Sequence, residues 1–249
     1  VVDKDLSILA LVGEQMKSHP GISGRMFGAL GRNGVNVRAI AQGSSERNIS
    51  AVISMADVRK ALNVLHEEFF ESSDKQVNLY IAGTGNVGRR LLEQLKKQQS
   101  WLKEHLRLQI RVTGLCNSRR MLVNDAGIDL ERWQDLLEAG EPANLETFTT
   151  AMISRNLRNS VFVDVTASEA VPPFYQSLLR KSMPVVACNK IAASSAFEHY
   201  RKLKDLAREY SCRFLFETNV GAGLPVIGTL NDLLGSGDSI HRIEAVLSG

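Results

Sequence analysis

Cysteine, proline and aromatic residues are scarce in this chain, and neither sign of charge dominates it. Three cysteines, Cys116, Cys188 and Cys212, are too few and odd in number for a disulfide framework, so we expect reduced thiols in a cytoplasmic protein. No apolar run reaches the roughly 20 residues of a membrane span, and the first residues carry no signal-peptide pattern. A net charge of +3 without a Lys/Arg block gives no indication of nucleic-acid binding, and the five histidines form no zinc pattern.

What is present describes an ordinary globular protein of two units. The chain has 249 residues, 44% of them hydrophobic, which suffices for two cores. We expect one domain over residues 1–71, a polar linker over 72–76 and a second domain over 77–249. The chain lacks an initiator Met and stops directly after a strand-like run, so we expect it to be a piece of a longer protein.

One stretch organises the second domain. Val77–Ala82 is apolar enough for a buried strand, and Gly83, Gly85 and Gly88 follow at the G-x-G-x-x-G spacing. The first glycine allows a sharp turn, the second lets the backbone approach a pyrophosphate, and the third lets the next helix pack closely. Alone this spacing is common in turns that bind nothing, but between a strand and a helix it predicts a dinucleotide site. The expected cofactor contacts are Gly83, Thr84, Gly85, Asn86, Val87 and Gly88, and the helix should bury Val87, Leu91 and Leu95.

The end of the next strand bears on the choice of cofactor. The apolar run around Ile110–Leu115 leads into Asn117, Arg119 and Arg120, where an NAD-selective site would carry an acidic residue. A guanidinium pairs with a 2′-phosphate, which favours NADP, with NAD as the alternative. Two arginines in a loop are also often merely solvated.

Two later strands deliver polar residues to the same sheet edge. Val161–Val165 is a continuous apolar run that ends at Thr166 and Ser168. Pro184–Cys188 leads directly to Lys190, which is either a site residue or a surface lysine at a strand end. Further on, Glu217 precedes a turn with two glycines that can present carbonyl oxygens to a hard cation or to substrate.

Several other elements follow from periodicity. Residues 1–71 predict the order β-α-β-β-α, with helices over Ile22–Asn33 and Ala56–Phe70, the second burying Leu62 among others. By spacing alone this is equally a packing domain without a ligand. Ser195 and Glu198 form a capping box for a helix that should bury Phe197. Pro225 should lie in the first turn of a helix that ends at Leu234. Residues 121–160 are read as an irregular insertion with two helices, and Ile240–Val246 as a strand.

The first domain resembles the last ACT regulatory domain of aspartokinases. The similarity rests on Ile8–Gly13, Ser18–Gly21, Asn33–Val37 and Gln42–Ser50. It implies a ferredoxin-like α+β unit that binds an amino-acid effector at a paired interface, through segments matching residues 16–24 and 34–40. Asn36 and Gln42 are the polar candidates. Threonine is the favoured effector, but the sequence does not separate it from methionine or lysine.

The second domain resembles the N-terminal half of homoserine dehydrogenase. The glycine turn is joined there by Asp164–Ser168, Asn189–Lys190, Glu217–Pro225 and Leu247–Gly249. The resemblance implies a Rossmann doubly wound parallel sheet with Thr166 and Ser168 near the cofactor. It gives Lys190 a catalytic, proton-handling role between nicotinamide and substrate. It also implies a sodium or potassium site, made largely of backbone carbonyls, at Glu217, Val220, Ala222 and Leu224.

Together the two resemblances indicate a bifunctional aspartokinase/homoserine dehydrogenase of threonine and methionine synthesis. The implied reaction is the NADP-dependent interconversion of L-homoserine and L-aspartate 4-semialdehyde, in a homo-oligomer (dimer or tetramer) with no nucleic-acid or membrane partner. In that family a further catalytic domain, expected here to start near 225–249, supplies other substrate and catalytic residues after the Leu-Ser-Gly segment, so we expect cofactor binding but poor turnover. One alternative is a non-catalytic amino-acid sensor with a Rossmann partner module, and another is an NADP dehydrogenase for a different amino-acid aldehyde.

Overall fold

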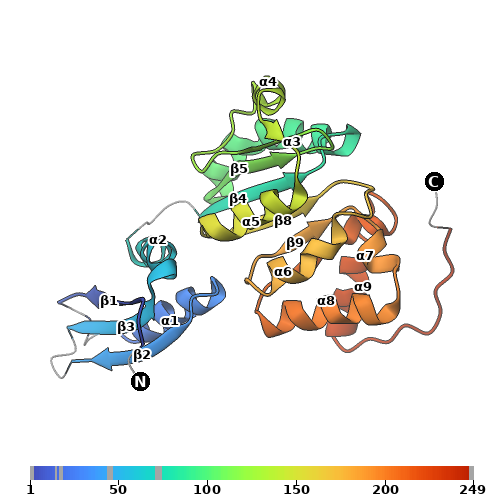
Figure 1. The fold of residues 1–249 in the computed structure, drawn as a ribbon. Helices are drawn as coiled ribbons and strands as arrows, with labels where there is room; N and C mark the ends of the chain where they lie inside the picture. Colours follow the sequence, from blue (N-terminus) through green and yellow to red (C-terminus); the bar gives the residue numbers. More distant parts are fainter. Residues whose placement is uncertain (1–2, 15, 17–18, 44–46, 71–74, 247–249) are drawn as a thin grey trace.

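The computed structural model describes residues 3–14, 16, 19–43, 47–70 and 75–246, which form two units (Figure 1). Each unit has its own sheet, and hydrogen bonds join the two units. No helix in these ranges is both long and apolar enough to cross a membrane. Cys116, Cys188 and Cys212 are all free cysteines in this structure.

The first unit is a small antiparallel sheet with two helices on one face. Its elements are β1 (Leu6–Val12), α1 (Ile22–Arg32), β2 (Val37–Gln42), β3 (Asn48–Ser54), a 3-10 turn (Met55–Asp57) and α2 (Val58–Phe69). The strand order is β1-β3-β2, so the predicted β-α-β-β-α order is confirmed. Alternation in β1 buries Leu9 and Leu11 against the helices, whereas Ile8 and Val12 lie on the open face.

The second unit is built on a larger, mostly parallel sheet. Its strands are β4 (Lys75–Ala82), β5 (Leu108–Cys116), β6 (Arg120–Val123), β7 (Glu141–Pro142), β8 (Ser160–Asp164), β9 (Val185–Ala187) and β10 (Phe214–Leu215). Its α-helices are α3 (Asn86–Leu106), α4 (Trp133–Glu138), α5 (Leu145–Arg155), α6 (Tyr175–Leu179), α7 (Ile191–Ser194), α8 (Phe197–Glu209) and α9 (Ile227–Gly235), with 3-10 turns at Pro172–Phe174 and Glu217–Asn219. Among the described residues the strand order is β10-β9-β8-β4-β5-β6-β7.

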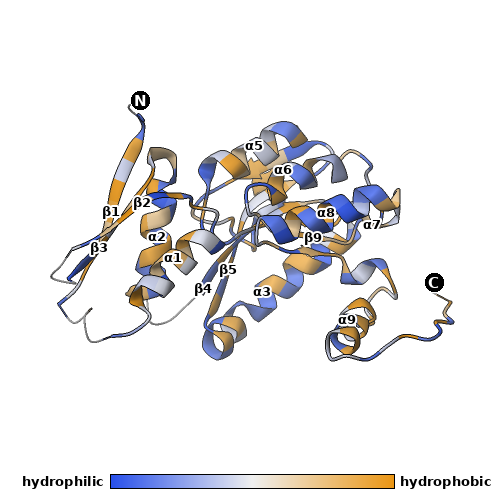
Figure 2. Cartoon of the chain, turned by 90° about the horizontal axis from the view of Figure 1, so that it is seen from below, coloured by the Kyte–Doolittle hydropathy of each residue, from blue (hydrophilic) through white to orange (hydrophobic). Residues whose placement is uncertain are grey.

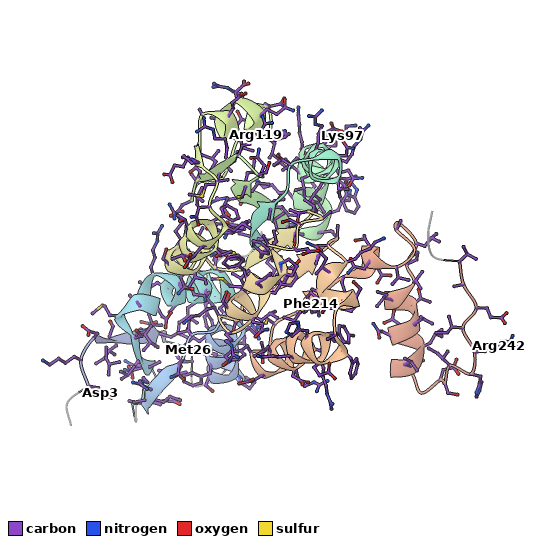
Figure 3. All side chains as sticks on the ribbon, turned by 45° about the vertical axis from the view of Figure 1, so that its right-hand side comes forward. Asp3, Met26, Lys97, Arg119, Phe214 and Arg242 are labelled. Carbon is purple, nitrogen blue, oxygen red and sulfur yellow. The ribbon has the colours of Figure 1, made fainter. Side chains whose placement is uncertain are left out.

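Helices cover both faces of this sheet, and β4 contributes to both cores. Tyr80 and Ala82 face a cluster that includes residues of α5, α6 and α8. Leu79 and Ile81 face the opposite cluster, beneath α3 and α4. Because both faces are buried, β4 reads as a nearly continuous apolar run, as parallel strands do. Figure 3 shows Phe214 inside this unit and Met26 inside the first.

The sheet corrects part of the expected topology. Residues 121–160 are not simply an irregular insertion, because β6 and β7 add an antiparallel edge next to β5. The four residues of β6 and the two of β7 are too short to show a periodicity. The predicted linker, residues 72–76, extends two residues too far, because Lys75 and Gln76 belong to β4 and pair with β5.

Four further expectations about single elements are wrong. Ser195 does not cap α8, because Ala196 occupies the N-cap and the Ser195 hydroxyl donates to the Ala192 carbonyl of α7. Pro225 precedes the N-cap residue of α9 and so lies outside its first turn. Residues 240–246 form no strand, since they have no neighbouring strand to pair with in the described structure. Three side chains predicted to face inward are at least half exposed instead: Leu62, Val87 and Phe197.

From α9 onward the chain lies apart from the sheet. Helix α9 has no buried residue among those described, and Figure 2 shows this largely apolar helix away from the sheet. Leu224 and Ile243 are both 65% exposed.

The two units meet at the amino-terminal ends of β4 and β8. The loop between α5 and β8 faces α2: Lys60 Nζ donates to Asn156 Oδ1 at 2.8 Å, and Asn156 Nδ2 donates to Asp57 Oδ1 at 3.0 Å. Arg158 donates to the Asn63 carbonyl at 2.9 Å and pairs with Glu67 at 3.4 Å. These polar contacts orient the first unit on the second.

A glycine contact tightens the same interface. Gly34 has φ +68°, and a Cβ on it would lie 2.9 Å from Ser182 Oγ and 3.0 Å from Ser182 Cβ. Ser182 itself adopts a left-handed backbone, φ 55°, where glycine is favoured. The two units therefore approach closely only because residue 34 has no side chain.

We expect Gly34→Ala to weaken the interface. Gly21→Ala is the matched control, since Gly21 also has positive φ but nothing lies within 4 Å of its added Cβ. In both variants alanine in the left-handed region costs about 1–2 kcal/mol. Gly34→Ala also brings its Cβ too close to Ser182, so thermal unfolding should give this variant the lower Tm. Ser182→Gly in the same chain should restore Tm to the level of the control. A double variant as unstable as Gly34→Ala alone would contradict this contact.

Candidate functional site

A cavity of about 740 Å³ opens at the carboxyl end of the central strands. Strands β5 and β8 lie on opposite sides of β4. The connection that leads from β4 to β5 and the connection that leads into β8 therefore diverge here and leave a crevice. Open α/β sheets place ligands at such a switch point. The lining residues are Ala82–Gly85, Cys116–Ser118, Ala143–Leu145, Val165–Ser168 and Val171.

The glycine turn forms one wall of this cavity. Gly83 has φ +104°, and a Cβ there would lie 2.9 Å from the Val165 carbonyl oxygen. A Cβ on Gly88 would lie only 2.2 Å from the Gly83 carbonyl oxygen, so α3 packs closely on the turn as expected. Around Gly85 nothing lies within 4 Å of an added Cβ. This open side, next to the uncapped N-terminus of α3, fits a pyrophosphate.

The end of β5 forms a second wall. Asn117 Oδ1 accepts from the backbone N–H groups of Arg119 and Arg120, each at 2.7 Å, so Asn117 shapes the loop that carries both arginines. The Arg120 guanidinium donates to the Gly140 carbonyl at 3.2 Å. Both arginines are exposed and neither lines the cavity. Burial raises the pKa of the neighbouring Cys116 thiol to about 11, so this lining residue is uncharged at pH 7.

A fully buried carboxylate organises the third wall. Asp164, at the end of β8, accepts from Tyr175 Oη at 2.6 Å, from Asn189 Nδ2 at 3.1 Å and from the Thr166 backbone N–H at 2.8 Å. Asn189 Nδ2 also lies 2.9 Å from the Ser168 carbonyl. Burial and the adjacent Asp164 charge raise the pKa of Tyr175 well above its ordinary value, so the phenol stays a donor.

This network ties the loop after β8 to the loop after β9. Thr166 and Ser168, predicted from the sequence, are therefore held in the cavity wall by Asn189. Lys190 follows at the same sheet edge as predicted, but it is exposed, serves as the N-cap residue of α7 and does not line the cavity. Asn86, Val87 and Gly88 also do not line it.

Some lining and supporting residues were not predicted. No sequence pattern marks Tyr175, because its partner Asp164 is eleven positions earlier in the chain and only the fold brings the two together. Asn144 lines the cavity and caps α5 by accepting from the Thr147 N–H at 2.8 Å. An Asn directly before a predicted helix is a recognisable cap signal. Ser118 also lines the cavity.

The residues expected at a cation site have other contacts. The Glu217 carboxylate accepts from the Ile227 and Gly228 N–H groups at 2.9 and 2.7 Å, and so caps α9. Gly221 and Ala222 both have left-handed backbone. Among the described residues no three His, Cys, Asp or Glu side chains are grouped to hold a metal. A site of backbone carbonyls at Val220, Ala222 and Leu224 needs no such group and stays a prediction.

The two effector candidates lie far apart along β2. Asn36 precedes β2 and lines a cavity between the units, whereas Gln42 is the last residue of β2 and is exposed. One chain therefore does not bring them into a single pocket, because a six-residue strand separates its ends by about 17–20 Å. Residues 17–18 of the expected effector segments lie outside the described residues.

We expect Tyr175→Phe to destabilise the protein by about 1.5–3 kcal/mol, because it removes a hydrogen bond to a buried carboxylate. Tyr80→Phe is the control: Tyr80 is equally buried, and its hydroxyl has no hydrogen-bond partner among the described residues. Urea unfolding monitored by circular dichroism compares the two. Equal midpoints for the two variants would show that the Tyr175 bond contributes little.

Known proteins match both units. Residues 9–69 match the family model described as ACT domain, and residues 83–217 match that of the homoserine dehydrogenase NAD binding domain. A bifunctional aspartokinase/homoserine dehydrogenase 2 of Arabidopsis thaliana is 44% identical over 98% of this chain. The corresponding bifunctional protein of Haemophilus influenzae is 40% identical over 100% of it. The chain spans 27% and 30% of the lengths of these relatives.

A solved structure agrees with these sequence matches. A hyperthermophilic archaeal homoserine dehydrogenase in complex with NADPH matches with a TM-score of 0.52 and 26% identity. The match covers 65% of this chain and 50% of that one. The second family model spans more than half of the sequence. This chain therefore belongs to the homoserine dehydrogenase family, and its NAD-binding domain is joined to an ACT domain, as in the bifunctional aspartokinase/homoserine dehydrogenases.

Proposed function

We propose that this chain supplies the cofactor domain of an NADP-dependent homoserine dehydrogenase, which interconverts L-homoserine and L-aspartate 4-semialdehyde in threonine and methionine biosynthesis. The proposal is supported by relatives whose names carry both activities and by the archaeal relative solved with NADPH. When bound, the nicotinamide cofactor accepts or supplies the hydride of this reaction.

The observation that carries the proposal is the cavity at the switch point of the sheet. Gly83–Gly88 and the start of α3 would hold the pyrophosphate, because Gly85 faces open space there. Thr166 and Ser168 would lie beside the nicotinamide end, fixed by the Asp164–Asn189 network. Lys190 would reach in from the adjoining loop to handle a proton on the substrate oxygen. The chain alone should turn over homoserine slowly, since the family completes its site with later residues.

The ACT domain would give this enzyme feedback regulation by an amino acid. Threonine is the effector we favour, acting on a homo-oligomer in which ACT domains pair. Asn36 and Gln42 of different chains would then contribute to one effector site, because a single chain holds them at opposite ends of β2.

We expect the chain to bind NADPH saturably, and Gly85→Asp to abolish this binding without lowering Tm. Gly85 is exposed and nothing lies within 4 Å of an added Cβ, so the new carboxylate fits the fold but repels the pyrophosphate. Gly235→Asp, equally open and distant from the cavity, is the charge-matched control. Cofactor fluorescence reports binding. If neither NADPH nor NADH bound, the cofactor role would fail and amino-acid sensing by the ACT domain would be the better proposal.

We expect Arg119→Gln to reduce NADPH affinity about tenfold or more, because a charge-assisted bond to the 2′-phosphate contributes about 1.5–3 kcal/mol. NADH affinity should be unchanged, since NADH has no 2′-phosphate. We select Arg119 because the Arg120 guanidinium already contacts Gly140. Arg201→Gln on α8, also exposed, is the control. An equal effect of Arg119→Gln on both nucleotides would argue against selection for NADP here.

A further inference from the structure

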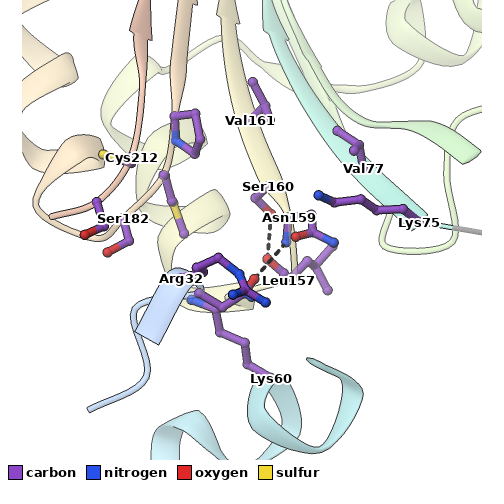
Figure 4. Close-up of a pocket in the computed structure, with 14 residues that line it drawn as sticks. Arg32, Lys60, Lys75, Val77, Leu157, Asn159, Ser160, Val161, Ser182 and Cys212 are labelled. Atoms are coloured by element: carbon purple, nitrogen blue, oxygen red, sulfur yellow. Dashed lines mark hydrogen bonds between the residues drawn. The ribbon is translucent and has the colours of Figure 1, made fainter. Parts of the chain in front are cut away.

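Two adjoining cavities lie between the ACT domain and the amino-terminal end of the large sheet. The smaller, of about 210 Å³, is shown in Figure 4, and the larger has about 540 Å³. They share Lys60, Ser182, Met183 and Ser211. Ser160 at the start of β8 lines the smaller one, whereas the residues after the end of β8 line the cofactor cavity. The two regions are therefore at opposite ends of the same strand.

Lys60 places a buried ammonium in this region without a direct ion pair among the described residues. It is only 7% exposed, and its ammonium donates to one acceptor, the neutral Asn156 Oδ1. Within the described residues no carboxylate lies within 4.0 Å of Lys60 to form an ion pair. Asp57 Oδ1 accepts from Asn156 Nδ2 instead. Two of the three ammonium N–H groups therefore have no acceptor among the described residues, and burying such a group is unfavourable.

The environment of Lys60 adds positive charge to the smaller cavity. Arg32 and Lys75 also line it, and no Asp or Glu among the described residues does. Figure 4 shows Arg32 and Lys60 entering from the ACT side and Lys75 from β4. Arg32 has a partner outside the cavity, Glu68, at 3.4 Å. Burial, and secondarily the charge of Lys181, lower the pKa of Lys60, while Asp57 opposes this.

The loops that face the ACT domain carry polar side chains where glycine would be less strained. Asn156, Asn159, Ser182 and Ser211 all have φ between 47° and 55°. The two asparagines make hydrogen bonds across or beside the interface. The Ser182 and Ser211 hydroxyls line both cavities without a hydrogen-bond partner among the described residues. They are thus available to a ligand.

We propose that the smaller cavity binds a small oxyanion, the carboxylate or phosphate group of a metabolite, with the Lys60 ammonium as its counter-ion and Arg32, Lys75 and Ser182 around it. An oxyanion supplies the acceptors that Lys60 lacks and offsets the excess positive charge. Because its contacts come from both units, the ligand favours their docked arrangement.

The test is thermal unfolding of the 249-residue chain with inorganic phosphate, acetate or glycine, at constant ionic strength adjusted with sodium chloride. The Gly85→Asp background removes binding of phosphate at the glycine turn. We expect Tm to rise with oxyanion concentration as a binding isotherm predicts. A lower Kd for phosphate identifies a phosphate source, and a lower Kd for acetate or glycine a carboxylate source.

Lys60→Met should raise the fitted Kd at least tenfold, whereas Lys202→Met, which removes an exposed charge on α8, should leave it unchanged. If Lys60→Met does not fold, Arg32→Gln/Lys75→Gln replaces it, since both side chains are exposed, and should raise Kd severalfold. The proposal is overturned if no oxyanion shifts Tm at tens of millimolar, or if the shift is the same in these variants as in the parent chain.

Discussion

The buried carboxylate of Asp164 is the constraint on which the site depends. An ionised group with no exposure is tolerated only when hydrogen bonds replace water, and here a phenol, an amide and a backbone N–H do so. Because these donors come from α6, from the loop after β9 and from the loop after β8, the ends of two neighbouring strands are fixed relative to each other. The cavity wall beside the glycine turn is rigid for this reason, and the Thr166 and Ser168 positions follow from it.

Much of the fold could be predicted because it obeys local periodicities. Helices α1 and α2 lie within one or two residues of the predicted bounds, Ile22–Asn33 and Ala56–Phe70, since apolar residues recur at helical spacing along one face of each. The edge strands β6 and β7 were missed because two to four residues carry no such pattern. Residues 240–246 show the opposite error. Ile240, Ile243 and Val246 suit a strand, but strand formation also needs a neighbour to pair with, and the described structure provides none.

The candidate site was predictable where one short segment carries the signal and not where the fold joins distant segments. Gly83, Gly85 and Gly88 are recognisable from their spacing, and the structure shows a positive φ at Gly83, close packing at Gly88 and open space around Gly85. Tyr175 and Lys60 could not be found in this way. The first matters through a contact with Asp164, and the second through a domain interface that no local pattern encodes. An exposed lysine and a buried lysine look identical in a sequence.

Helix α2 ends at Phe69 and β4 begins at Lys75, so five residues join the two domains. Whatever its conformation, a tether of that length spans at most about 20 Å. Each domain therefore meets the other at an effective concentration in the millimolar range, independent of how dilute the protein is. An interface of polar contacts therefore needs less free energy to keep the domains docked than it would need to hold separate proteins together. A small change in its free energy shifts the docked population substantially, which is the property a regulatory joint requires.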